Sequence, residues 1–421
     1  MDKRSIISSS IGNVIEWYDF GLFAIYSPIL ARIFFPTTDE RTQLIATFTI
    51  FAVGFLCRPL GAFIFGYLGD KQGRAKTLRF SILMICLPTL LIGCLPTYNQ
   101  VGLSAAVLLS LIRIWQGISI GGEYTGNIIY IAEMAPKKNR AAYTSLAPSG
   151  SNLGILLATL VGTICNYFFS TATFYAWGWR IPYLLSGILS LFVYLVRLKI
   201  KETQVFSYLE AKKLLTKNPI SAVFKNNMSD ILRTMGMVLM GSTFYYFSFI
   251  YLPLVVDTYL KISLLKTFGI MTILFVLMLF LIPLSGWLCD RIGRRKMLLF
   301  NAFIITISII PAYYFLLHSM LGILFTLFLF TIFSSLEQGT TPVAIVENFP
   351  PSTRYTGISF AYNFDNGIFS GTVPLICTWL SSKNHFSLLP AVYIAFCAFI
   401  TLLVIYCFVG ETKNSNLVIE K

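Results

Sequence analysis

Charge is scarce in this sequence. Only 12% of its 421 residues are Asp, Glu, Lys or Arg, whereas 56% are hydrophobic. A soluble domain needs more polar surface than this composition supplies, so a soluble fold is excluded. The composition predicts an integral membrane protein.

Residue types that build metal and nucleotide sites are scarce as well. The two histidines, His318 and His385, fall near the ends of expected helices, which argues against an enzyme with a His/Asp metal cluster. The eight cysteines include no CxxC pair and lie in or beside apolar runs, as packing residues do. No Gly-Lys dipeptide occurs, so a P-loop and a built-in ATP motor are absent. We predict no metal site and no enzyme activity.

Apolar runs long enough to cross a bilayer recur along the whole chain. A spanning helix needs about 20 mostly apolar residues, and unalternating runs of this length exclude barrel strands. We predict an all-α membrane protein with twelve transmembrane helices, at 10–34, 43–68, 77–97, 101–133, 141–169, 178–199, 231–258, 264–289, 297–317, 320–346, 355–381 and 387–410. The polar stretch 199–230 is expected to be a cytoplasmic linker, with a short amphipathic helix, between six-helix bundles at 1–198 and 231–421.

The formal net charge of +14 follows the expected topology. Most of the 32 lysines and arginines fall in segments on one side of the membrane, and only Arg58 and Arg113 lie within helices. This asymmetry places both termini in the cytoplasm, because cytoplasmic loops carry the excess of basic residues. The basic excess is therefore interpreted as topology and contact with anionic membrane lipids, and nucleic-acid binding is not expected.

The two halves of the chain share a repeated loop motif. Gly66-Tyr-Leu-Gly-Asp70-Lys-Gln-Gly73-Arg74 recurs as Gly286-Trp-Leu-Cys-Asp290-Arg-Ile-Gly293-Arg294. A second set of residues repeats at a nearly equal spacing: Glu123, Glu133, Pro136 and Arg140 recur as Glu337, Glu347, Pro350 and Arg354. Parallel six-helix repeats related by a pseudo-two-fold axis along the membrane normal, with a solute held between them, are expected.

The repeated loop is the candidate gate. Its glycines permit a tight turn, while Asp70 or Asp290 can cap a helix start and pair with an arginine across the two halves. A solvated basic turn that only fixes topology is the alternative. The motif resembles the signature loop of the major facilitator superfamily. The predicted gating residues are Gly66, Asp70, Gly73, Arg74, Arg140, Asp290, Gly293, Arg294 and Arg354.

Three further segments and a short sequence after helix 6 narrow the resemblance. The segments are Gly12 to Phe20 in the first helix, Arg113 to Tyr124 in the fourth and Trp177 to Pro182 before the sixth; Lys201-Glu202-Thr203 follows the sixth. Together they resemble the metabolite:proton symporter family, and Glu123-Tyr-Thr-Gly126 looks closest to its proline/betaine branch. The resemblance implies a proton-coupled importer in a bacterial inner membrane, with the proton as coupling ion and no cofactor. Because the tail after the last expected helix is short, we do not expect osmotic activation through the coiled coil of some osmosensing members.

Ionisable residues at membrane depth are costly and mark functional sites. Glu16 and Asp19 share a face of the first helix, and Arg113, Gln116 and Glu123 share a stripe of the fourth. By resemblance, Asp19 opposite Arg113 is the expected protonation switch, with Glu123 as a further coupling candidate. A static buried ion pair between the two helices is the alternative.

The expected solute contacts lie on the same helices and on their counterparts in the second half. Aromatic faces in the seventh helix, such as Tyr245 and Tyr246, can hold an ammonium group by cation–π attraction, although tyrosines near a helix end also form interfacial belts. The full candidate set is Asn13, Glu16, Trp17, Gln116, Tyr124, Tyr245, Tyr246, Glu337 and Asn363.

A proton symporter for a small zwitterion such as proline or glycine betaine is the favoured function. An organic-acid symporter of the 2-oxoglutarate, citrate or shikimate type is the alternative, but a dicarboxylate needs two or more cations in the cavity, and only Arg58 and Arg113 qualify by depth. A nutrient sensor of transporter descent is not expected without a large cytoplasmic extension. We expect the chain to work as a monomer.

Overall fold

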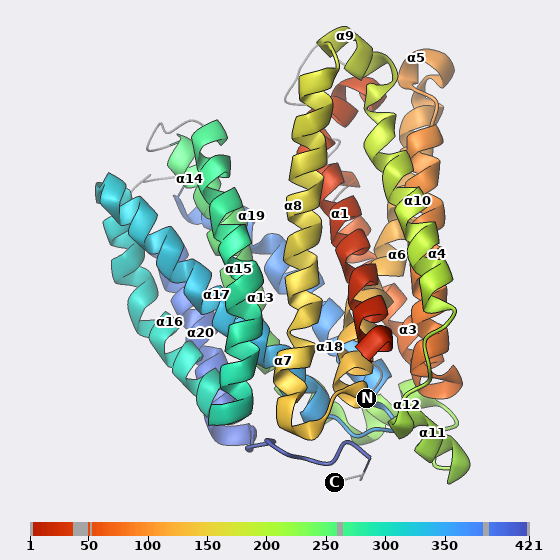
Figure 1. The fold of residues 1–421 in the computed structure, drawn as a ribbon. Helices are drawn as coiled ribbons and strands as arrows, with labels where there is room; N and C mark the ends of the chain where they lie inside the picture. Colours follow the sequence, from red (N-terminus) through yellow and green to blue (C-terminus); the bar gives the residue numbers. More distant parts are fainter. Residues whose placement is uncertain (1–2, 37–48, 51–52, 259–263, 382–386, 419–421) are drawn as a thin grey trace.

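The computed structural model describes residues 3–36, 49–50, 53–258, 264–381 and 387–418. Its secondary structure in these ranges is helical throughout, in two bundles that stand side by side in Figure 1. The helices of the first bundle are α1 Lys3–Phe34, α3 Arg58–Gln72, α4 Arg74–Cys94, α6 Leu103–Met134, α7 Arg140–Thr144, α8 Leu146–Phe168 and α10 Arg180–Arg197. The short segments α5 Tyr98–Val101, η1 Lys137–Asn139, α9 Thr171–Thr173 and η2 Phe174–Gly178 connect them.

The second bundle repeats this arrangement. Its elements are α13 Met228–Tyr246, η3 Phe247–Tyr251, α14 Leu252–Thr258, α15 Leu264–Ile292, α16 Arg294–His318, α17 Met320–Asn348, α18 Arg354–Asp365, η4 Asn366–Ser370, α19 Gly371–Ser381 and α20 Leu389–Phe408. The segments η3 and η4 are π-helical turns inside continuous helices, a feature found frequently at functional sites. Nine helices of the described chain are long and apolar enough to cross a membrane by themselves.

The remaining spans of the predicted twelve are interrupted or carry several charges. The first, α1, contains Glu16 and Asp19; the helix predicted at 43–68 falls partly outside the described residues and continues as α3; and α18, η4 and α19 together form the eleventh. The predicted all-α, twelve-helix fold is confirmed. The linker holds two short helices, α11 Gln204–Ala211 and α12 Pro219–Asn226, where one was expected.

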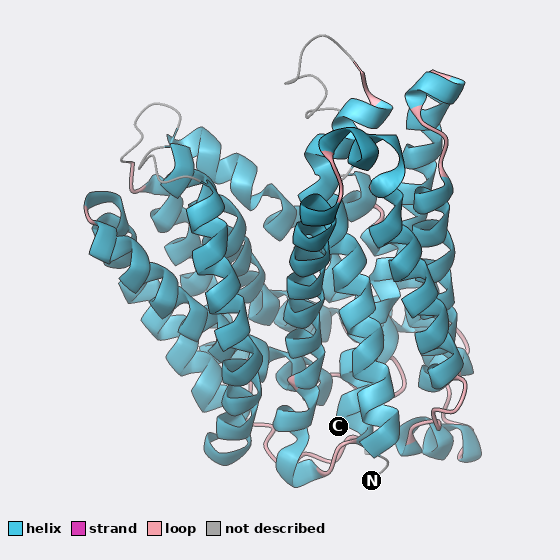
Figure 2. Cartoon of the chain, turned by 45° about the horizontal axis from the view of Figure 1, so that its top comes forward, coloured by secondary structure: helices cyan, strands magenta, loops and turns pink. Residues whose placement is uncertain are grey.

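Both ends of the described chain lie at one end of the molecule, together with α11 and α12 (Figure 1). We call this the basal end. From it, the ribbons of the two bundles diverge toward the opposite end (Figures 1 and 2). Helix α1 starts at Lys3, earlier than predicted, because its polar first turns continue below the apolar stretch, where the Ser8 and Ser10 hydroxyls bond to backbone carbonyls.

Candidate functional site

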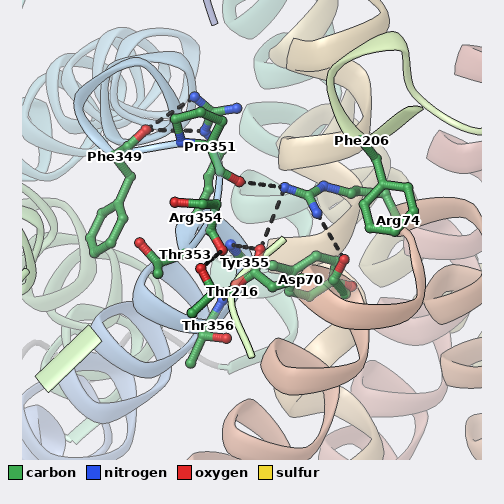
Figure 3. Close-up of polar contacts among 12 residues, drawn as sticks. Asp70, Arg74, Phe206, Thr216, Phe349, Pro351, Thr353, Arg354, Tyr355 and Thr356 are labelled. Atoms are coloured by element: carbon green, nitrogen blue, oxygen red, sulfur yellow. Dashed lines mark hydrogen bonds and ion pairs between the residues drawn. The ribbon is translucent and has the colours of Figure 1, made fainter. Parts of the chain in front are cut away.

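The two halves meet at the basal end through the loop after α3. Asp70 accepts hydrogen bonds from the backbone N–H groups of Tyr355 at 3.1 Å and Thr356 at 2.8 Å, which belong to the first turn of α18 in the other half. Figure 3 shows Asp70 and Arg74 facing this helix start. A carboxylate at a helix N-terminus satisfies unpaired amides and is stabilised by the helix dipole. Asp70 therefore caps a helix of the opposite half.

A buried charge network surrounds this cap. Arg74 pairs with Asp70 and with Glu133, each at 3.4 Å, and donates to the carbonyl oxygen of Pro351 at 2.8 Å. Arg354, from the other half, pairs with Glu133 at 2.8 Å. Because these charges are buried and paired, removing one of them leaves its partner unpaired in a low-dielectric site, which is destabilising.

The second half contains an equivalent network, in which Asp290 caps a helix of the first half. Asp290 accepts from the backbone N–H groups of Ala141 at 3.0 Å and Ala142 at 2.9 Å at the start of α7. Arg294 pairs with Asp290 at 3.0 Å and with Glu347 at 2.9 Å. Arg140 of the first half pairs with Glu347 at 2.5 Å. The structure thus brings the predicted charged gating residues into two equivalent networks between the halves.

The glycines of this motif have separate structural causes. Gly73 and Gly293 adopt φ values of 107° and 113°, a conformation that L side chains rarely adopt, at the turns that join α3 to α4 and α15 to α16. Gly66 lies against Thr356 of the other half, and a Cβ there would collide with its backbone. Gly73 and Gly293 are therefore required by their turns, and Gly66 by the close contact between the halves.

Sequence reasoning missed two acidic residues that bind the starts of α4 and α16, beside these charge networks. Glu202, after α10, accepts from the backbone N–H of Arg74 at 3.0 Å, and Glu411, after α20, accepts from that of Arg294 at 2.9 Å. The following threonines donate to the network glutamates: Thr203 to Glu133 at 2.6 Å and Thr412 to Glu347 at 2.8 Å. Burial raises the pKa of Glu202, against the lowering effect of the amides it accepts from. The repeated Glu-Thr pair was the available sequence signal.

A cavity between the halves lies among the predicted solute contacts. Its empty volume is about 660 Å³, part of it open to solvent. Five of the nine predicted solute-contact residues line it: Trp17, Tyr124, Tyr245, Tyr246 and Glu337. In the described part of the chain, its lining includes no lysine or arginine. An aromatic wall with one carboxylate suits a cationic group.

The other four predicted contact residues lie outside this lining and are buried in the protein. The Asn13 amide donates to the carbonyl of Ala147 at 2.5 Å, which ties α1 to α8. The Asn363 amide donates to the carbonyl of Gly121 at 2.8 Å, across the halves. Gln116 and Glu16 are buried among α1, α3, α4 and α6.

The predicted coupling residues Asp19 and Arg113 are joined through Gln116. The Gln116 amide donates to Asp19 at 2.7 Å, and Arg113 donates to the Gln116 oxygen at 2.6 Å. The Arg113 guanidinium also lies over the ring of Phe23, 3.8 Å from its centroid. All three polar residues are buried, so the structure brings the predicted switch together with an amide inserted between acid and base.

Glu123 has a partner that the sequence reasoning did not identify. Arg197, at the end of α10, holds its carboxylate with two bonds of 2.8 and 2.5 Å, and Ser81 donates to it at 2.5 Å. Counted from the repeated Glu-Thr pairs, the position equivalent to Arg197 in the second half is Tyr406. Glu337, the repeat of Glu123, therefore lacks that arginine and lines the cavity instead.

The structure adds polar residues to the cavity wall that sequence reasoning missed. Asn152 of the first half donates to Gln338 of the second at 2.9 Å. The Tyr124 ring stacks on the ring of Tyr362, with 4.9 Å between centroids. Ser242 lines the cavity and donates at 2.6 Å to Asp365, a carboxylate buried behind it. No motif marked Asn152, Ser242 or Gln338, because their roles depend on how the two halves meet.

A second, smaller cavity of about 230 Å³ empty volume lies within the first half. Arg58, Arg113 and Gln116 line it together with Phe20 and Phe55. The two arginines that the sequence placed at membrane depth therefore line one cavity. Both arginines belong to the first half, whereas Glu337 and Asp365 belong to the second.

Comparison with known proteins identifies the family. A family model described as Major Facilitator Superfamily matches residues 10–370. The chain belongs to this superfamily. It is 30% identical over 427 residues to the glycine betaine/proline/ectoine/pipecolic acid transporter OusA of Dickeya dadantii (strain 3937). The alignment covers 99% of this chain and 84% of the relative. It is likewise 30% identical over 414 residues to the proline/betaine transporter of Escherichia coli (strain K12), covering 95% and 82%.

Solved structures of this superfamily share the fold. The proton:xylose symporter XylE bound to 6-bromo-6-deoxy-D-glucose superposes with a TM-score of 0.81 over 99% of this chain and 97% of its own, at 17% identity. The inward open conformation of XylE superposes with a TM-score of 0.66. The chain is a multi-pass membrane transporter and not an enzyme, and the resemblance to proline/betaine transporters is confirmed.

Proposed function

We propose that this transporter imports a small zwitterion such as glycine betaine or proline together with protons, by alternating access. The observation that carries the proposal is the cavity between the halves, which presents aromatic faces and Glu337 with no basic side chain among its described lining. A quaternary or secondary ammonium is attracted by such a wall through cation–π contacts and the carboxylate. The names of the relatives support the same solute class.

We place the carboxylate end of the zwitterion near Arg58. Its guanidinium lies over the ring of Phe55, 5.5 Å from the centroid, and that ring packs edge-on against Tyr246 of the cavity lining, with 6.3 Å between centroids. A solute with its ammonium toward Glu337 and its carboxylate toward Arg58 would contact both halves at once. Contact with both halves is what couples binding to closure around the solute.

The closed basal end supports an outward-facing conformation, with the basal end in the cytoplasm. The recurring basic residues and both ends of the described chain lie there, in keeping with the positive-inside rule. We further propose a bacterial inner-membrane location, contact with anionic lipids, action as a monomer, and the proton as the coupling ion without another cofactor.

An organic-acid symporter is the second candidate, and the observation that favours it is the small cavity lined by Arg58 and Arg113. Uptake of a labelled solute panel in a transport-deficient host decides between the two. We expect glycine betaine or proline to accumulate and the accumulation to disappear with an uncoupler. Accumulation of 2-oxoglutarate, citrate or shikimate in place of the zwitterions would refute the proposed solute class.

A further inference from the structure

Glu16 is a buried carboxyl group in α1 that the proposed cycle has not used. Its side chain is 2% exposed, and neither carboxyl oxygen has a hydrogen-bond partner among the described residues. An ionised carboxylate without a donor is very costly in such a site, so the group is neutral in this conformation. Glu16 therefore carries a proton while the basal end is closed.

The charged groups around Glu16 come from three helices. Glu123 on α6 and Arg197 on α10 form a satisfied pair, which lies against Gly12 one turn earlier in α1. Arg58 on α3 lines the smaller cavity together with Phe20, which stands one turn after Glu16 in α1. Helix α8 contributes no Asp, Glu, Lys, Arg or His to this surrounding, and α4 contributes the Ser81 hydroxyl to Glu123.

Arg58 is the one of these cations whose bonding depends on how the halves meet. Its Nε donates to the Asn363 side-chain oxygen at 3.1 Å, and Asn363 belongs to α18 in the other half. Arg197 is bound within its own half instead, to Glu123 and to backbone carbonyls of Leu78 and Ser9. An opening of the basal end that separates α18 from α3 would remove this partner from Arg58 and leave Arg197 with all of its own.

We propose that Glu16 is a proton-binding site that controls the charge which Arg58 offers to the solute. With Glu16 protonated, the Arg58 charge is available to the solute carboxylate. When the basal end opens and Asn363 departs, Arg58 turns to Glu16, which releases its proton to the cytoplasmic side. The ionised Glu16 then neutralises Arg58, and the solute leaves.

This arrangement gives the sign of coupling that symport requires. Proton binding at Glu16 strengthens solute binding, and by reciprocity solute binding strengthens proton binding. The step is a transfer of one proton from the Glu16 carboxyl to water at the basal side, with no other bond made or broken. It assigns Glu16 to proton binding in place of the solute contact expected from the sequence, and it rests on the proposed zwitterion symport.

Equilibrium binding over a pH series tests the role of Glu16, with purified wild type and Glu16→Gln. For wild type, the Kd for glycine betaine should rise about ten- to a hundredfold as pH rises and Glu16 ionises, a range typical of coupled sites. Glu16→Gln imitates the protonated carboxyl, so its Kd should stay low and change less than about twofold. Choline keeps the trimethylammonium group without the carboxylate, and its Kd should not follow pH in either protein.

One control variant and one alternative test variant accompany this measurement. Glu210→Gln, an exposed site on α11, should retain the wild-type pH dependence. If Glu16→Gln does not fold, Asn363→Ala in the otherwise native chain serves instead. It releases Arg58 toward Glu16, so the loss of betaine affinity should begin at lower pH.

The outcomes separate the two proposals. A Glu16→Gln protein with the wild-type pH dependence, or an Asn363→Ala protein without the shift, overturns the role of Glu16 alone. A wild-type protein that binds no zwitterion at any pH overturns the proposed function and this inference with it.

Discussion

Asp70→Asn is expected to shift this transporter toward opening at its basal end. Asp70 accepts two amide hydrogen bonds from α18 and pairs with Arg74. Asparagine keeps one acceptor oxygen, so at least one of the two bonds to α18 is lost together with the charge. A hydrogen bond to a charged group contributes about 1.5–3 kcal/mol. Since 1.4 kcal/mol is tenfold, the ratio of inward- to outward-facing molecules should rise about 10- to 100-fold.

Distances between spin labels at Lys76 and Lys296, exposed at equivalent helix starts in the two halves, measure this shift in a variant without native cysteines. The population with widely separated labels should grow, while the solute Kd changes only a few-fold. Asp290→Asn should act alike, because Asp290 caps α7 in the same way. Glu210→Gln, at an exposed position of α11, removes a charge away from both networks and should change nothing. An unchanged distance distribution, or a loss of binding equal to the loss of transport, would refute the gating role.

Three further changes test the remaining parts of the proposed cycle. Asp19→Asn, a mimic of the protonated acid beside Gln116, should abolish proton-driven accumulation and keep counterflow; normal accumulation would move the principal proton site elsewhere. Glu337→Gln should weaken betaine binding by about 2 kcal/mol, or about 30-fold, in titration calorimetry, because the ammonium loses its carboxylate; an unchanged Kd would remove Glu337 from the solute site. Deletion of residues 414–421 removes the Ser415 and Leu417 carbonyls that accept from Arg140 and Arg354, and should speed solute exchange at constant Kd; slower exchange would contradict a latch by the tail.

The fold was predictable because most of the membrane-spanning helices can be recognised from a short stretch of the sequence. Runs of about 20 apolar residues locate the helices, and the repeated loop motif locates the two halves. The contact between the halves at Asp70 and Asp290 was predictable for the same reason, since both residues stand in a contiguous motif. Helix α1 begins at Lys3 and not at the predicted residue 10, because its polar first turns extend below the apolar stretch.

The cavity and the partners of buried charges were less predictable, because they depend on contacts between distant helices. Glu123 and Asp19 are similar in sequence terms, a carboxylate inside an apolar run. Only the packing of α10 shows that Arg197 holds Glu123, while Gln116 lies between Asp19 and Arg113. The bond between Arg58 and Asn363 joins residues from opposite halves, and no spacing in the chain encodes it.

Uptake of labelled glycine betaine by proteoliposomes that contain only this protein tests the central proposal most directly. With a driving force of about 150 mV from an imposed proton gradient, one charge moved inward is worth about 3.5 kcal/mol, or about 300-fold accumulation. We expect accumulation that rises with the imposed gradient and collapses with an uncoupler, in the absence of sodium and ATP. Accumulation that survives the uncoupler, or equilibration without accumulation under a full proton gradient, would contradict proton-coupled import.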